Sequence, residues 1–196
     1  MYRNFPFNLV LASASPRRKE LLEQLGFVFH IEVKPVDETP NPMQPPEEVA
    51  HSIATQKMDA FCIEDYPANT ILISADTVVA IDGKILGKPS SHFEATMMLK
   101  SLSGRTHEVI TAVCLKSASK FISFCEVTKV CFSDLSDADI EYYIDNYKPF
   151  DKAGSYGIQE WIGLGFISAI HGSYTNVVGL PTETLRRVLL SFDEGC

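Results

Sequence analysis

The feature that most constrains the fold is the apolar run from Thr70 to Ile81, TILISADTVVAI. It is rich in Ile and Val and apolar on both faces, which predicts a strand in the middle of a sheet that is covered on both sides. Asp76 interrupts this run, and a buried carboxylate is costly without a cation, a metal or hydrogen-bond partners. Two interpretations remain: Asp76 is a structural ion-pair partner, or it is a metal ligand and base at a strand end.

Strands and helices alternate on both sides of this run. A short apolar strand over 7–12 leads into a helix over Pro16–Leu25, with Ser15 as N-cap and Gly26 as stop signal. The patterns predict further strands over 28–33, 107–115, 121–132 and 165–170, and helices over 47–63, 93–102, 136–146 and 182–192. Such interleaving predicts an α/β fold with a mixed sheet flanked by helices.

Length and composition indicate one globular domain over residues 1–196, with room for two lobes. The formal net charge of −8 argues against a nucleic-acid partner, although a local basic pocket for a small anion is compatible with it. No apolar run is long enough to span a membrane, and the N-terminus lacks signal-peptide organisation. Five irregularly spaced cysteines predict reduced, mostly buried thiols, and we expect a cytoplasmic protein.

The segment Leu11–Arg18, LASASPRR, joins the first strand to the first helix through small residues. Arginine in a first helical turn opposes the helix dipole, at roughly 0.3–1 kcal/mol each. An anion bound there would reverse that sign, because helix N-termini and arginines both bind phosphate. The alternative is that Arg17 and Arg18 are solvated or paired with acids such as Glu20. The glycines and lysine of a P-loop are absent.

Two further segments carry weaker signals. Lys88 lies between Gly87 and Pro89, where a hairpin after Ile81 would return it to the cleft beside Asp76, although a lone lysine is more often solvated. The segment 151–159, DKAGSYGIQ, has small residues, an aromatic ring and Gln159, which suit a loop that reads a base edge; a plain structured loop is the alternative. The histidines lack ligand spacing, which argues against zinc.

Taken together and in order, these segments resemble the Maf family of nucleotide pyrophosphatases. The resemblance is carried by LASASPRR (11–18), SADTVV (74–79), GKP (87–89), LSGRTHEV (102–109), KAGSYGIQ (152–159), GSY (172–174) and VGLP (178–181). It spans nearly the whole chain, and the ordered set is far more specific than any one motif. The resemblance implies two lobes around a deep cleft, in a fold similar to inosine triphosphate pyrophosphatases.

The resemblance also implies roles for individual residues. The catalytic acid–base position falls on Asp76, and the positions that discriminate substrates fall on Arg17, Thr77 and Gln159. Phosphate and metal contacts fall on Ser13, Arg18, Glu38, Lys57 and Lys88. The cofactor would be a divalent cation, Mg²⁺ or Mn²⁺, held by Asp76 and Glu38.

The implied reaction converts a nucleoside triphosphate to its monophosphate and pyrophosphate. The form of residues 151–159 is similar to the branch that uses dTTP and UTP, whereas Glu160 and Trp161 stand where small residues are more usual and change the rim of the base pocket. The alternatives are the branch that uses 7-methyl-GTP and a catalytically idle, nucleotide-binding septation regulator. A plain interaction domain leaves Asp76 and the paired arginines unexplained. The resemblance also suggests a homodimer.

Overall fold

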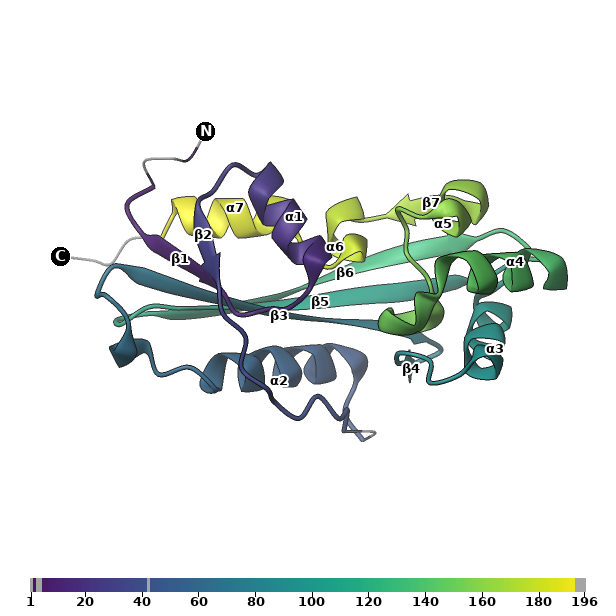
Figure 1. The fold of residues 1–196 in the computed structure, drawn as a ribbon, viewed down its shortest axis with the longest axis horizontal. Coiled ribbons are helices and arrows are strands. Elements are labelled where there is room, and N and C mark those ends of the chain that lie inside the picture. The colour runs from purple at the N-terminus through teal and green to yellow at the C-terminus, as the bar shows by residue number, and fades with distance from the viewer. Residues whose placement is uncertain (1, 3–4, 42, 193–196) are drawn as a thin grey trace.

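A twisted, mixed sheet of seven strands runs through the molecule, as the computed structural model of residues 2, 5–41 and 43–192 shows (Figure 1). The strands are β1 (Asn8–Leu11), β2 (Phe29–Ile31), β3 (Thr70–Ile81), β4 (Lys84–Leu86), β5 (Thr106–Lys116), β6 (Phe121–Phe132) and β7 (Ile167–His171). Their order is β2-β1-β3-β5-β6-β7, with β4 pairing to β3 outside this path. β1 is parallel to β2 and β3, and the other pairs are antiparallel. The predicted α/β class with a mixed sheet is confirmed.

Helices cover both faces of the sheet around β1 and β3, and we call this part the large lobe (Figure 1). Its helices are α1 (Pro16–Gln24), α2 (Pro46–Asp59) and α7 (Thr182–Leu190). The buried residues of α2, among them Ile53 and Met58, pack against one face, in a cluster with Leu72 and Ile110. The residues of α1 and α7 pack against the opposite face. β3 is therefore covered on both sides, as its apolar sequence predicts.

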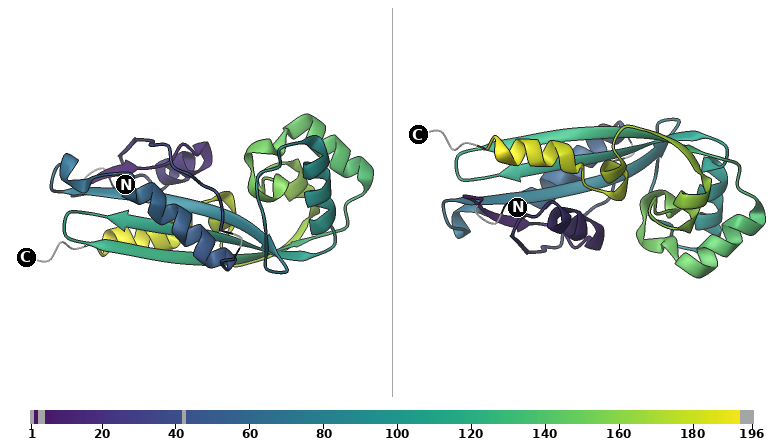
Figure 2. Two further views of the ribbon diagram at one scale, coloured as in Figure 1. Left: turned by 90° about the horizontal axis from the view of Figure 1, so that it is seen from below. Right: turned by 90° about the horizontal axis from the view of Figure 1, so that it is seen from above.

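The small lobe forms at the other end of the long strands (Figure 2). It contains α3 (His92–Leu102), α4 (Asp137–Tyr147), α5 (Trp161–Phe166) and the 3₁₀ turns Pro149–Asp151 and Ala153–Ser155. Its core joins Leu99 of α3 and Tyr143 of α4 to Ile81 of β3 and Phe132 of β6. A short helix, α6 (Tyr174–Val178), leads from β7 back to the large lobe.

A gap in the pairing of β3 positions the functional residues. On one edge, β3 pairs with β1 only as far as Ile73, and it pairs with β4 only from Val79 onward. Residues 74–78 face no strand of the described chain on that edge, while β5 pairs with them on the other. Asp76 lies in this gap. It is thus in the middle of β3 and not at a strand end, because a change of neighbouring strands makes the opening.

Most elements match the sequence-based prediction, with boundaries shifted by a few residues. The pattern did not predict β4, α5 or α6, and α2 ends at Asp59, earlier than the predicted Ile63. The cysteine prediction is partly wrong: Cys62, Cys114, Cys125 and Cys131 are free, but only Cys114 is buried, and Cys196 lies outside the described residues. Within the described part of the chain, every helix is too short or too polar to cross a membrane.

Candidate active site

A cleft of about 520 Å³ opens between the two lobes at the gap in β3. It receives residues from α1, α2, β3, the loop after β4 and the segment before α5. Every site residue predicted from the sequence lines it: Ser13, Arg17, Arg18, Glu38, Lys57, Asp76, Thr77, Lys88 and Gln159. Residues that are up to 146 positions apart in the chain, from Ser13 to Gln159, therefore meet in one place.

The turn before α1 is built as the sequence predicts. Ser15 caps the helix by accepting a hydrogen bond from the Arg18 backbone N–H, and Pro16 occupies the first turn. The Ser13 hydroxyl accepts a bond from the Ser15 backbone N–H at 3.3 Å. The helix begins at the edge of the cleft, so its first N–H groups and its positive dipole end lie beside the space that a ligand would fill.

Arg18 is buried and hydrogen-bonds to three separate segments of the chain. Its guanidinium donates to the Gly179 carbonyl at 2.9 Å, to Ser13 Oγ at 3.2 Å and to Thr77 Oγ1 at 3.0 Å. These bonds use three of the five N–H groups of the guanidinium, and the other two have no partner among the described residues. Burial lowers the pKa of Arg18 from its ordinary value, and the Asp76 charge opposes this effect. Arginine stays protonated in proteins regardless.

Arg17 points across the cleft to the small lobe. Its Nη1 lies 3.1 Å from Oδ2 of Asp151, so its acidic partner is Asp151 and not the Glu20 considered above. Burial acts to raise the pKa of the Asp151 carboxyl, but Lys152 and Arg17 outweigh it, and the net pKa is lowered. Arg17 and Asp151 thus connect the beginning of α1 to the segment that precedes Gln159.

Lys57 lies between two carboxylates at the floor of the cleft. Its Nζ is 2.7 Å from Oδ1 of Asp76 and 3.3 Å from Oε2 of Glu38. Lys57 comes from α2 and Asp76 from β3, while Glu38 comes from the proline-rich connection between β2 and α2. Asp76 is therefore an ion-pair partner of Lys57 in this structure, and it also lines the cleft, which is compatible with a role as base or metal ligand.

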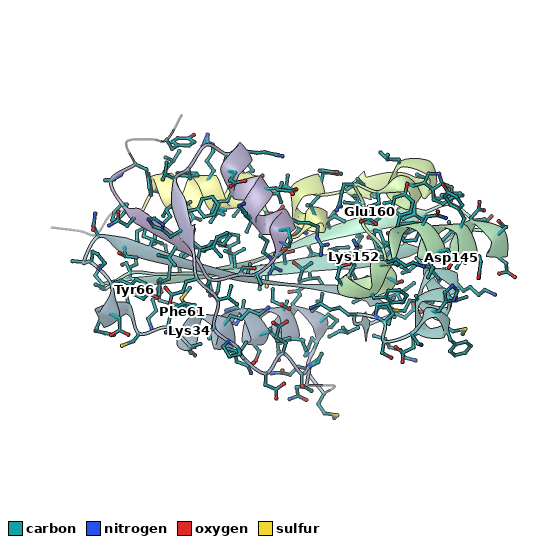
Figure 3. The ribbon with its side chains drawn as sticks, in the orientation of Figure 1. Lys34, Phe61, Tyr66, Asp145, Lys152 and Glu160 are labelled. Atoms are coloured by element: carbon teal, nitrogen blue, oxygen red, sulfur yellow. The ribbon has the colours of Figure 1, made fainter. Side chains whose placement is uncertain are left out.

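The same two acids suit a hard divalent cation. Mg²⁺ is usually held by one or two carboxylates together with substrate phosphates, and Asp76 and Glu38 already converge on one cation, the Lys57 ammonium. A second cluster of possible ligands, His92, Glu141 and Asp145, lies on α3 and α4 of the small lobe and does not line the cleft; Asp145 is labelled in Figure 3. Sequence spacing missed that cluster because its histidine and acids come from different helices.

The small-lobe wall consists of the segment Lys152–Gln159, which we call the base loop. The side chains of Gln159 and Lys88 are exposed, and both face the cleft. Tyr156 is buried and hydrogen-bonds through its hydroxyl to Nε2 of His107 at 2.7 Å. Burial lowers the pKa of His107 to about 4, so this imidazole is neutral at pH 7.

Sequence reasoning missed Lys152 as a residue of the site. Its side chain is nearly buried and contacts both Asp151 and Glu160. Its position inside the motif DKAGSYGIQ was the only signal available. A buried lysine requires a counter-charge, and the sequence did not reveal that Glu160 provides one.

The family profile described as “Maf-like protein” matches residues 8–192. A dTTP/UTP pyrophosphatase of Flavobacterium psychrophilum is similar, with 49% identity over 184 residues, 93% of each chain. One of Porphyromonas gingivalis, strain ATCC 33277, is 45% identical over 191 residues, 96% of each chain. A solved HAM1 protein from Coxiella burnetii matches 64% of this chain and 73% of its own, at 15% identity and a TM-score of 0.42, too remote for any functional statement.

Proposed function

Because this chain belongs to the family of Maf-like proteins, we propose that it hydrolyses dTTP and UTP, releasing the nucleoside monophosphate and pyrophosphate. The observation that carries the proposal is the convergence of Asp76, Glu38 and Lys57 at the floor of a cleft that Arg17, Arg18 and Lys88 also line. Carboxylates and cationic side chains arranged in this way suit a substrate that carries several negative charges and reacts at phosphorus.

Each wall of the cleft has its own task in this proposal. Arg17, Lys88 and the two remaining N–H groups of Arg18 bind phosphate oxygens, and the N-terminus of α1 adds its dipole. The base loop encloses the pyrimidine, where the Gln159 amide can donate to and accept from the base edge. Ser13 and Thr77 hold Arg18 in place through their hydroxyls. The substrate would thus lie across the gap in β3, with its phosphates beside Asp76.

Asp76 acts on the water that attacks the α-phosphorus. Only its Oδ1 receives a hydrogen bond from the described part of the chain, which leaves Oδ2 free to accept the water proton. Lys57 fixes the orientation of the carboxylate and places a positive charge near the reacting phosphate. A divalent cation bound by Asp76 and Glu38 would neutralise phosphate charge and polarise the phosphoryl group. Pyrophosphate leaves as the water oxygen bonds to phosphorus.

The deciding experiment is pyrophosphate release from dTTP, UTP, CTP, dCTP, ATP, GTP and 7-methyl-GTP, with Mg²⁺, Mn²⁺ or chelator. We expect turnover of dTTP and UTP that chelator abolishes. Turnover of 7-methyl-GTP alone would contradict the pyrimidine assignment and leave the reaction type standing. Saturable nucleotide binding without turnover would favour the septation-regulator alternative. A cytoplasmic location, a homodimer and a single domain over residues 1–196 stay predictions from the sequence.

A further inference from the structure

Glu160 follows the base loop directly, and its side chain turns back toward that loop (Figure 3). Glu160 is the N-cap residue of α5, and its side chain makes no capping hydrogen bond there. Its carboxylate instead contacts Lys152 and Tyr143 in the small lobe.

The carboxylate contacts the beginning and the middle of the base loop at once. Its Oε1 lies 3.1 Å from Nζ of Lys152, the first residue of the loop. Its Oε2 accepts a hydrogen bond from the Tyr143 hydroxyl, which itself accepts a bond from the Gly157 backbone N–H at 3.0 Å. The carboxylate also packs on Gly157 so closely that a Cβ there would lie 2.8 Å from Cδ of Glu160. We call Glu160, Lys152, Tyr143 and Gly157 the clamp.

The clamp consists of groups that are poorly exposed to water. Tyr143 is fully buried on α4, and the Lys152 side chain is 10% exposed. Removing one member of a buried hydrogen-bonded set leaves its partner without compensation, which costs more than the net value of the bond. Asp151 cannot replace Glu160 fully, because it is largely exposed and is shared with Arg17.

The base loop needs such support because its backbone is strained. Ser155 has a φ of +62°, a conformation that non-glycine residues seldom adopt and that surrounding contacts must maintain. Gly154 packs on Val79 of β3, where a Cβ would lie 2.9 Å from Cγ1, and its N–H donates to the Gly87 carbonyl at 3.1 Å. The loop therefore packs on β3 and hydrogen-bonds to Gly87, next to Lys88. The clamp contacts the loop at Lys152 and Gly157.

We propose that Glu160 is a positioning residue whose bonds to Lys152 and Tyr143 hold the base loop, and with it Gln159, in the geometry that selects the pyrimidine base. The inference rests on the proposed function, since it names the residue that sets base preference at that same site. Glu160 does not contact the reacting phosphate in this account. Its loss should therefore weaken recognition of the base more than it slows the chemical step.

The test is Glu160→Gln, which keeps the shape of the side chain and removes its charge. We expect KM for UTP and dTTP to rise about tenfold, as the loss of a charge-assisted bond predicts. We expect kcat to change by less than about threefold, because the groups at the phosphate are untouched. The preference for UTP over CTP, measured as the ratio of kcat/KM values, should fall, since the two bases differ at the edge that Gln159 faces.

Two further variants separate positioning from general damage. Tyr143→Phe removes only the hydroxyl and should change KM and the UTP/CTP preference in the same direction by a smaller factor. Glu183→Gln on α7 removes a carboxylate from an exposed ion pair with Arg187 and should leave both unchanged. KM and the preference ratio do not depend on the fraction of folded enzyme, so partial unfolding does not imitate the result.

The outcomes divide clearly. If the wild-type protein fails to hydrolyse UTP and dTTP, the proposed function fails, whatever the variants do. If the wild type is active and Glu160→Gln keeps its KM and its UTP/CTP preference, the proposed positioning role of Glu160 is wrong, while the proposed function stands. A loss of kcat alone, with unchanged KM and preference, likewise overturns the positioning role. If Glu160→Gln does not fold, the same two readouts on Tyr143→Phe decide.

Discussion

Two lysines that line the cleft each lie between two carboxylates, and the pairs come from different lobes. Lys57 in the large lobe contacts Asp76 and Glu38, and its side chain is 13% exposed. Lys152 in the small lobe contacts Asp151 and Glu160, and its side chain is 10% exposed. The charges and the burial of the two lysines are similar. The two clusters differ in where their acids come from and in what else those acids bind.

The acids around Lys57 come from separate elements and carry few other contacts. Asp76 is on β3 and Glu38 is in a connection, and neither accepts a further side-chain hydrogen bond from the described residues. The acids around Lys152 are engaged elsewhere: Asp151 with Arg17, and Glu160 with Tyr143. Free lone pairs facing a cleft suit chemistry and metal binding, whereas saturated carboxylates suit positioning. We therefore expect the number of existing partners, more than the charge, to distinguish the proposed reactive acids from the positioning acids.

The largest effect should come from Asp76→Asn, which keeps the shape of the side chain and removes the carboxylate that we propose as the base. We expect kcat for dTTP and UTP to fall by about a thousandfold, within the range for a lost general base. The fold should persist, because an amide oxygen can still accept the bond from Lys57. Steady-state kinetics with a circular-dichroism melt would check both parts. Near-native turnover would break the comparison, since Asp76 would then be no more reactive than the acids around Lys152.

His107, which hydrogen-bonds to Tyr156 of the base loop, should make the free energy of unfolding depend on pH. Burial lowers the pKa of His107 from 6.5 to about 4, so the unfolded chain binds its proton more tightly than the folded chain does. The contribution of His107 is present above pH 6.5 and is lost as pH falls from 6.5 to about 4, up to about 3 kcal/mol. Urea unfolding at pH 7, 5.5 and 4 would measure it.

The matched variant for this pH experiment is His107→Gln, which retains a hydrogen-bonding group for Tyr156. It should lose less stability than the wild type over the same pH range, because it has no imidazole to protonate. Carboxylates titrate in both proteins, and the difference between the two curves cancels them. Identical curves would show that the imidazole under the base loop does not govern the acid sensitivity of the small lobe.

A smaller effect should distinguish the two clusters by their metal requirement. Glu38→Gln should raise the Mg²⁺ concentration for half-maximal turnover about tenfold, because one oxygen ligand loses its charge. Glu160→Gln should leave that concentration unchanged, since Glu160 is saturated by Lys152 and Tyr143. Initial rates over a Mg²⁺ series would give both values. An equal shift in both variants would mean that the two carboxylates are not distinguished by their contacts.

The sequence predicted one cluster and missed most of the other for physical reasons. Asp76 was visible because a carboxylate in an apolar strand is costly, and the resemblance then indicated Lys57 and Glu38. Glu160 accepts a hydrogen bond from Tyr143, and in the sequence Tyr143 is an ordinary helix residue. Only the packing of α4 in the small-lobe core brings the two side chains together. The gap in β3 was equally hidden, since β4 is only three residues long and leaves no periodic pattern. Contacts between elements determine these features.

The smallest effect should come from the same kind of ionic contact on the surface. On α7, Nε of Arg187 lies 3.6 Å from Oε1 of Glu183, one helical turn away, and the two side chains are 64% and 77% exposed. Water screens such a pair, so Glu183→Gln should change the free energy of unfolding by about 0.5 kcal/mol or less. Lys152→Met, which leaves Glu160 without its cation, should cost more than that. Urea unfolding of both variants would measure the difference, and equal losses would show that burial does not strengthen the Lys152 cluster.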